Sequence, residues 1–237
     1  VGAGLSGSYL AKKISELGLN TLIIEKSKGI GGRLATKPVG VGIADYGCQY
    51  LKPKSKELSE LIKELKNKNL IKESNIFQES EAFIAPYGMN KIPQYLSLGV
   101  NTLLNQKVSA LKKNSNHWEV RTNSFVLKSK ILVLTMPINQ ASELLKVSNM
   151  PIVDLPTADY KSFYTITFQN INTIGSKPVL KNDFAPWICN NLLKGLSIDQ
   201  NTFTVNINEE LSNTLLNIEH NKKHELIKRH LKESGFK

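Results

Sequence analysis

Cysteine is scarce in this chain of 237 residues, and so are long apolar runs. The two cysteines, Cys48 and Cys189, are too few for a disulfide framework and lack metal-ligand spacing, so we expect buried small side chains. The sequence contains no run of about 18 apolar residues, so we expect no transmembrane helix. No basic and then apolar leader opens the sequence. These absences predict a globular protein in the cytoplasm.

Arginine is also scarce, although the chain is strongly basic, with a formal net charge of +11. Such a charge nominally favours an anionic partner, for example nucleic acid. Only Arg33, Arg121 and Arg229 are arginines, and the lysines alternate with glutamates in segments such as KELSELIKELKNKN. Without clustered arginines and an aromatic face, we expect no nucleic-acid partner.

What the sequence does contain is a glycine pattern at its start, G-x-G-x-x-G, formed by Gly2, Gly4 and Gly7. In this pattern the first glycine permits a tight turn from strand to helix, and the second lets the backbone approach a pyrophosphate. The third lets the helix pack on the strand. The helix that follows, beginning at Leu5 and Ser6, would bind phosphates through its unpaired N–H groups and its dipole.

The residues after the glycines complete a dinucleotide-binding unit. Apolar residues over 5–17 recur at helical spacing, and TLIIE then predicts a short parallel strand that ends at Glu25. An acid about twenty positions after the glycines is placed to accept hydrogen bonds from ribose hydroxyls, and Lys26 adjoins it. The alternative, a glycine-rich turn in an unrelated β-α-β unit, is less favoured.

A second glycine motif follows the acid and favours FAD over NAD. Lys28-Gly29-Ile30-Gly31-Gly32-Arg33 resembles the second glycine motif of flavoproteins of the amine oxidase and glutathione reductase type. Adjacent glycines such as Gly32 allow close approach to a long cofactor. The guanidinium of Arg33 can pair with a pyrophosphate through a fixed fork of donors.

Further motifs narrow this resemblance to the renalase-like FAD-dependent oxidoreductases. The motifs are GGRLAT over 31–36, DYGCQY over 45–50, PYGMN over 86–90 and an apolar run that ends in TMP at 135–137. Cys48 departs from the family, which usually has alanine there. The resemblance implies FAD contacts from Leu34, Ala35, Thr36, Gly47, Gln49, Tyr50 and the Val108 backbone. An ordinary glycine-rich turn at 45–50 and an ordinary strand valine at 108 remain alternatives.

The fold class implied is α/β: a Rossmann-type FAD-binding domain with a second α+β substrate domain on a larger, mostly antiparallel sheet. We assign residues 1–50 and 88–150 to the first domain, and 51–87 and 151–237 to the second. Periodicity predicts helices from residue 55, over 90–99 and over 139–147, and two helices in the C-terminal tail. It predicts a β meander over 101–134 that ends in a fully covered strand at 131–134. Further strands are predicted over 76–85, 160–171, 183–191 and 201–208.

Two groups of side chains in the second domain allow more than one interpretation. Its aromatic residues are expected to form core, or else to line a pocket for a planar substrate. His220 and His224 are four residues apart on a predicted helix, but the neighbouring lysines repel a metal ion, so we expect no metal site.

The function implied by the resemblance is hydride transfer from a small reduced substrate to FAD, with dioxygen or another acceptor reoxidising the flavin. The substrate would be a dihydronicotinamide nucleotide such as NAD(P)H, or an amine. The alternatives are a desaturase, isomerase or protoporphyrinogen-oxidase-like flavoprotein with a hydrophobic substrate, and a non-catalytic dinucleotide-binding module. No catalytic acid or base is identified, and the oligomeric state is not predicted.

The two ends of the sequence lack features that such flavoproteins have. Val1 is the last residue of the strand expected before Gly2, and no counterpart of the C-terminal G-D motif, which meets the ribityl phosphate, is found. We therefore expect a fragment that holds FAD poorly or not at all.

Overall fold

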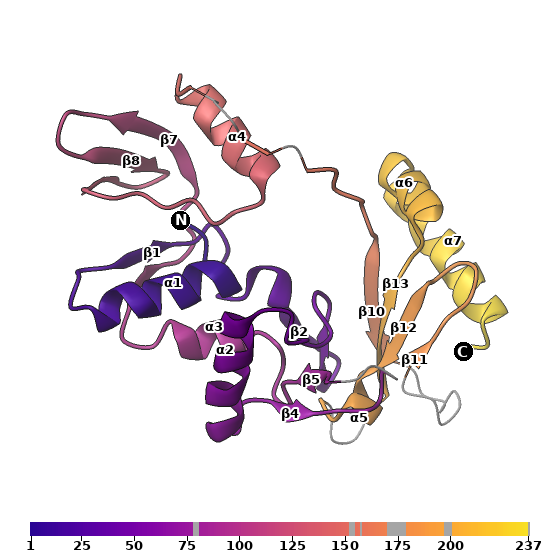
Figure 1. Cartoon of the computed structure of the whole chain (residues 1–237). Helices are drawn as coiled ribbons and strands as arrows, with labels where there is room; N and C mark the ends of the chain where they lie inside the picture. Colours follow the sequence, from indigo (N-terminus) through magenta and orange to yellow (C-terminus); the bar gives the residue numbers. More distant parts are fainter. Residues whose placement is uncertain (78–80, 152–154, 157, 170–178, 197–200, 237) are drawn as a thin grey trace. The chain divides into compact units, whose positions relative to one another are not determined.

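The computed structural model describes residues 1–77, 81–151, 155–156, 158–169, 179–196 and 201–236, which form two compact units (Figure 1). Unit 1 comprises Val1–Leu34 and Asn90–Asp159, and unit 2 comprises Ala35–Met89 and Tyr160–Lys237. Residues 35–50, which we assigned to the FAD-binding domain, are grouped with unit 2.

Unit 1 opens with the predicted helix and the parallel strand that follows it. Helix α1 (Leu5–Glu16) is followed by strand β1 (Leu22–Ile24), which pairs in parallel with β6 (Asn101–Leu103). The Gly2 N–H donates to the Ile24 carbonyl at 2.9 Å, so the start of the chain lies beside β1. Small buried residues on α1, including Ala11, allow it to pack closely on the sheet and on α3 (Lys91–Leu96).

The rest of unit 1 is an antiparallel sheet covered by a helix. Strands β7 (Val108–Lys113), β8 (Trp118–Thr122) and β9 (Val126–Ser129) form the predicted meander, and α4 (Ile138–Val147) packs against β7. The meander prediction was wrong for residues 101–103, because that strand pairs with β1 instead.

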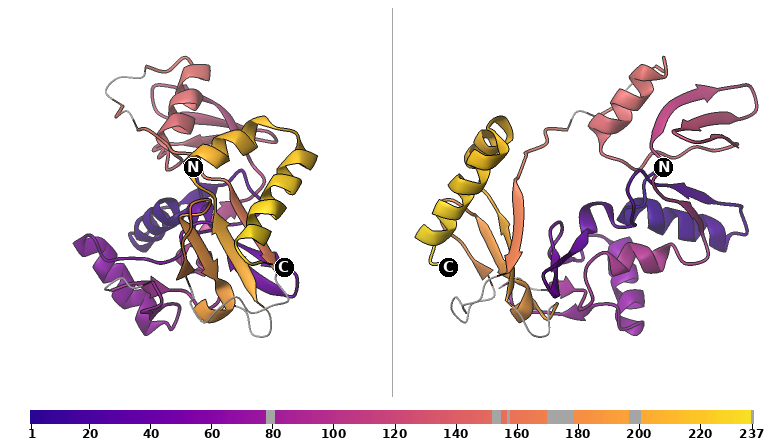
Figure 2. Two further views of the ribbon diagram at one scale, coloured as in Figure 1. Left: turned by 90° about the vertical axis from the view of Figure 1, so that its right-hand side faces the viewer. Right: turned by 180° about the vertical axis from the view of Figure 1, so that it is seen from behind.

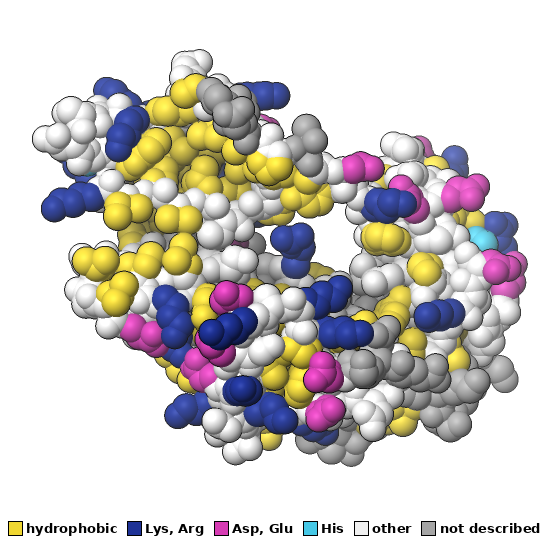
Figure 3. Space-filling view, in the orientation of Figure 1, with side chains coloured by type: hydrophobic (Ala, Val, Ile, Leu, Met, Phe, Trp, Pro, Cys, Tyr) yellow, Lys and Arg dark blue, Asp and Glu magenta, His cyan; other side chains and the backbone are white. Residues whose placement is uncertain are grey.

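The apolar segment 131–134 was predicted to be a fully covered parallel strand, and this was wrong. It forms no strand. The Val1 amino group donates to the Val133 carbonyl at 2.6 Å, the N–H of Thr135, just after the segment, donates to the Val1 carbonyl at 3.0 Å, and Ser129 Oγ donates to the Ile131 carbonyl at 2.6 Å. One neighbouring residue is too short to form a ladder. Ile131 is accordingly 73% exposed, and Figure 3 shows hydrophobic side chains gathered on the face of unit 1 that carries α4 and the meander.

Unit 2 begins with a hairpin of β2 (Thr36–Val39) and β3 (Gly42–Asp45). The predicted helix is α2 (Lys56–Asn67), which begins after Ser55, whose side chain accepts from the Leu58 N–H. Of the strands predicted over 76–85, the structure has β5 (Phe83–Ile84), paired with β4 (Lys72–Glu73), and residues 78–80 lie outside the described residues.

The larger sheet of unit 2 is antiparallel, as predicted. Its strands β10 (Thr165–Gln169), β11 (Val179–Leu180), β12 (Trp187–Asn190) and β13 (Thr202–Asn206) lie in the order β10-β13-β12-β11. The short helix α5 (Asn191–Lys194) follows β12. The two predicted tail helices, α6 (Glu209–Asn217) and α7 (His220–Glu233), lie along one face of this sheet (Figure 2). The α/β fold class with a second, mostly antiparallel sheet is confirmed.

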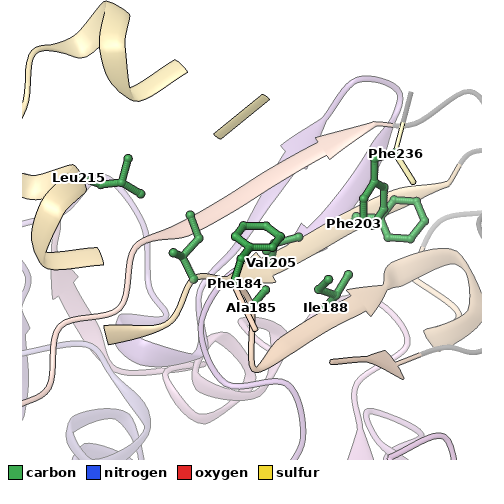
Figure 4. Close-up of a cluster of buried hydrophobic side chains, with 8 residues drawn as sticks. Phe184, Ala185, Ile188, Phe203, Val205, Leu215 and Phe236 are labelled. Atoms are coloured by element: carbon green, nitrogen blue, oxygen red, sulfur yellow. The ribbon is translucent and has the colours of Figure 1, made fainter. Parts of the chain in front are cut away.

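Aromatic residues fill the core between that sheet and its helices (Figure 4). Phe203 is 1% exposed, stacks on Phe168 with ring centroids 5.6 Å apart, and meets Phe236 edge-on at 5.1 Å. Of the two interpretations of these aromatics, core is correct for Phe168 and Phe184. Phe163, by contrast, is half exposed.

The Phe203→Ala variant should lose about 3 to 5 kcal/mol of unfolding free energy, because a fully buried ring leaves a cavity that its neighbours cannot fill. Urea denaturation followed by circular dichroism measures this loss. The exposed Phe163→Ala variant is the control and should stay within about 0.5 kcal/mol of the parent. Equal stability of the two variants would show that the core is placed wrongly.

Candidate functional site

A cavity of about 470 Å³ in unit 1 lies at the carboxyl end of β1. It is lined by the start of the chain, the end of β1, the first residues of β7 and one side of α4. Three residues predicted to bind the adenosine end of FAD line it, namely Gly2, Glu25 and Val108, and Lys26 lines it too. In open α/β sheets the carboxyl ends of the strands are where nucleotides bind.

Glu25 is the buried acidic group of this cavity, and its side chain also holds the glycine loop. Its Oε2 accepts from the Ala3 N–H and its Oε1 from the Ser27 N–H, both at 2.8 Å, and the residue is 8% exposed. Each carboxylate oxygen can accept more than one hydrogen bond. Glu25 can therefore anchor the loop and still accept from a hydroxyl group in the cavity. The bond to Ala3 was not predicted from the sequence.

The glycine loop ends at the N-terminus of α1, as predicted. Gly4 is the N-cap, no side chain caps the helix, and the first turn, which contains Leu5, Ser6 and Gly7, carries no acidic residue. The first-turn N–H groups of a helix have no acceptor within the helix, and the helix dipole makes this end positive. The arrangement suits an anion.

Two glycines of the pattern, Gly7 and Gly4, differ in what the fold itself requires of them. A Cβ on Gly7 would lie 2.0 Å from the Gly2 carbonyl oxygen, so the fold itself excludes a side chain there. A Cβ on Gly4 would meet only the Gly32 Cα, at 3.8 Å, and the Gly4 φ of −83° is accessible to any residue. No contact within the described residues explains glycine at position 4, whereas close approach by a ligand would.

The second glycine motif lies against the first, backbone to backbone. The Gly31 N–H donates to the Ala3 carbonyl at 3.0 Å, and a Cβ on Gly32 would come within 2.9 Å of the Gly4 Cα. Arg33 follows in the 3-10 turn Gly32–Leu34 and is exposed, while Leu34 is buried. Among the described residues, Arg33 has no hydrogen bond or ion pair, so its guanidinium is available to an anion.

The residues predicted to contact the flavin ring, Ala35, Thr36, Gly47, Gln49 and Tyr50, all belong to unit 2. The side chain of Gln49 is bonded within its own loop, because its Nε2 donates to the carbonyls of Asp45 at 2.8 Å and Gly47 at 3.0 Å.

The Tyr50 ring stacks on Phe77, with centroids 4.6 Å apart, and Trp187 adjoins them. Sequence reasoning found neither the aromatic stack nor the Gln49 hydrogen bonds, since the partners are distant in the chain or are backbone atoms.

The two cysteines are not activated nucleophiles. Burial raises the pKa of Cys189 to about 12, and Cys189 is fully buried, as predicted. Burial also raises the pKa of Cys48, which is partly buried and donates from Sγ to the Tyr50 carbonyl. Because the thiolate is the reactive form, neither side chain suits covalent chemistry near neutral pH.

The first 65 residues match the family model of the NAD(P)-binding Rossmann-like domain. No curated protein sequence matches the chain significantly. Solved structures, however, resemble nearly all of it. A putative protoporphyrinogen oxidase from an Exiguobacterium species has a TM-score of 0.69 at 9% identity, over 98% of this chain and 81% of that one.

Two amine oxidases resemble the chain as well. Cyclohexylamine oxidase from Brevibacterium oxydans has a TM-score of 0.67 at 12% identity, over 98% of this chain and 79% of that one. Putrescine oxidase with bound putrescine has a TM-score of 0.65 at 12% identity, over 94% of this chain and 77% of that one. The chain has the amine oxidase fold. In the part of the chain that the structure describes, none of the helices combines the length and apolar character needed to span a bilayer.

Two glycine substitutions distinguish a glycine that the fold requires from a glycine that leaves space for a ligand. Gly7→Ala should lose about 1 to 3 kcal/mol of unfolding free energy, because its Cβ collides with the Gly2 carbonyl. Gly4→Ala should match the parent or gain up to about 1 kcal/mol, since the residue has space and an ordinary φ. Thermal or urea denaturation tests this, and a reversed order of the two variants contradicts the assignment.

Proposed function

We propose that this chain is an FAD-dependent oxidoreductase of the renalase-like type. The observation that carries the proposal is the buried Glu25 carboxylate, which bonds the glycine loop and at the same time lines the cavity at the carboxyl end of β1. The likeness to structures with the amine oxidase fold supports it.

The adenosine half of FAD fits the chemistry of that cavity. Glu25 would accept hydrogen bonds from the ribose hydroxyls, and its negative charge disfavours a nucleotide with a phosphate on the ribose. The Val108 backbone at the start of β7 would meet the adenine. Aliphatic side chains such as Ile24 and Leu144 line the same cavity and suit a flat base.

The pyrophosphate fits the glycine loops. The uncapped N-terminus of α1 offers N–H groups, the lack of a Cβ at Gly4 leaves room for close approach, and Arg33 supplies a charge-assisted donor. A strand-to-helix turn that binds no anion does not require these three features together.

FAD supplies hydride acceptance and electron transfer to dioxygen or another acceptor. The chain supplies binding and orientation, with Ala35, Thr36, Gly47, Gln49 and Tyr50 proposed near the ring. Asp45, the acidic residue of that segment, bonds to Lys194 and is not available as a base. A dihydronicotinamide nucleotide gives up hydride without losing a proton to a base, so we propose it as the substrate class.

FAD titration of the chain, followed by quenching of flavin fluorescence, tests the binding site. The parent should bind FAD saturably, and Glu25→Gln should bind it roughly 10- to 150-fold more weakly, because hydrogen bonds to a charged acceptor contribute about 1.5 to 3 kcal/mol. Gly4→Ala should also bind more weakly while keeping its stability.

Glu143→Gln is the matched control for this titration. Glu143 lines the same cavity from α4 but is exposed, and its FAD affinity should stay within about twofold of the parent. Equal affinities of Glu25→Gln and Glu143→Gln would remove Glu25 from the site.

Anaerobic mixing of the FAD-loaded chain with candidate donors tests the reaction. Reduced nicotinamide nucleotides, including the isomers with hydride at other ring positions, should bleach the visible flavin absorbance, and admission of air should restore it. Bleaching by putrescine or cyclohexylamine alone would favour the second candidate, an amine oxidase, which the fold likeness supports. Bleaching by a porphyrinogen alone would favour a hydrophobic substrate, and bound FAD that no donor reduces would indicate a non-catalytic module.

A further inference from the structure

A buried ion pair lies in unit 2. Lys194 Nζ lies 2.6 Å from Asp45 Oδ2, and both side chains are 0% exposed. The two residues are 149 positions apart, with Asp45 at the end of β3 and Lys194 at the end of α5. Burial of two charges is unfavourable unless their geometry is good and their other polar groups are satisfied.

Asp45 meets that condition through further hydrogen bonds. Its Oδ1 accepts from the Met89 N–H at 2.9 Å and from the Thr36 hydroxyl. Its carbonyl accepts from the Thr204 hydroxyl at 2.7 Å. Asp45 therefore joins β2, β13, α5 and the segment at Met89 at the point where the segment 45–50 begins.

Lys194 also reaches the other end of that segment. Its Nζ donates to Gln49 Oε1 at 3.4 Å, while Gln49 Nε2 donates to the carbonyls of Asp45 and Gly47. The ammonium group has donors only, so it orients the Gln49 amide with its oxygen toward Lys194 and its NH₂ toward the loop. One buried lysine thus fixes the first and the fifth residue of a six-residue segment.

We propose that Lys194 is a positioning residue that sets the conformation of residues 45–50 for the flavin ring of FAD. This rests on the proposed function, which puts Gly47 and Tyr50 near the ring. Lys194 is fully enclosed and bonded to Asp45 and Gln49, so it acts through them and does not touch the cofactor. The proposed adenosine contacts belong to unit 1, which predicts that Lys194 affects FAD and ADP unequally.

The Lys194→Met variant of the full chain removes the ammonium group and keeps an apolar side chain of similar length. Titration calorimetry should give an FAD affinity at least roughly tenfold below that of the parent, because the loop that meets the ring is no longer held. ADP affinity should stay within about twofold, because ADP has no flavin. The visible circular dichroism of bound flavin, which reports a fixed ring environment, should weaken.

A double variant tests the same role in case the single variant does not fold. Asp45→Asn combined with Lys194→Met leaves no unpaired buried charge, and it should show the same loss of FAD affinity and flavin dichroism with ADP affinity retained. Lys63→Met, at an exposed position of α2, is the control and should match the parent for both ligands.

The outcomes are separable. Parent-like FAD affinity and flavin dichroism in either folded variant would overturn the positioning role and leave the proposed function intact. Equal losses for FAD and ADP would overturn it too, because they would show a general structural defect. A parent chain that binds ADP but no FAD would contradict the proposed function, and the positioning role with it.

Discussion

The hydrogen bond from the Ala3 N–H to the Glu25 carboxylate is the contact on which the candidate site depends. It ties the glycine loop to the carboxyl end of β1. The backbone of Glu25 continues the connection, because its N–H donates to the Leu103 carbonyl and its carbonyl accepts from the Gln106 N–H. One buried acid therefore holds the loop, the parallel sheet and the segment that enters β7, and it does so inside the cavity where a ribose would bind.

Close backbone packing gives that contact its surroundings. The first glycine loop lies on the second, with Gly31 bonded to Ala3 and the Cα atoms of Gly4 and Gly32 adjacent. Gly7 and Gly32 are explained by packing within the chain. Gly4 is not, and a position where the fold permits a side chain but the sequence has none points to a ligand that needs the space.

Local patterns in the sequence predicted much of unit 1 and of the site. The order of α1 and β1, the acid at Glu25 and the part of the meander over 108–129 each follow from residues close together in the chain. Partners distant in sequence were missed. The pairing of 101–103 with β1 and the bond between Lys194 and Asp45 depend on which segments meet in space, and no local periodicity encodes that.

Gln49 shows the same limit at a single residue. The motif resemblance implied a contact with the flavin ring, and that contact stays a prediction. The structure adds that both ends of the Gln49 amide are bonded, to Lys194 and to loop carbonyls. A motif predicts that a residue type is required at a position, but it does not say whether the side chain meets a ligand or shapes the loop that does.

The most direct test of the account is a crystal structure of the chain grown with FAD. The account predicts adenosine density in the cavity of unit 1, with ribose hydroxyls bonded to Glu25 and the pyrophosphate on the first turn of α1 beside Gly4. Density for the nucleotide at any other place, with the Glu25 carboxylate meeting only Ala3 and Ser27, would contradict it.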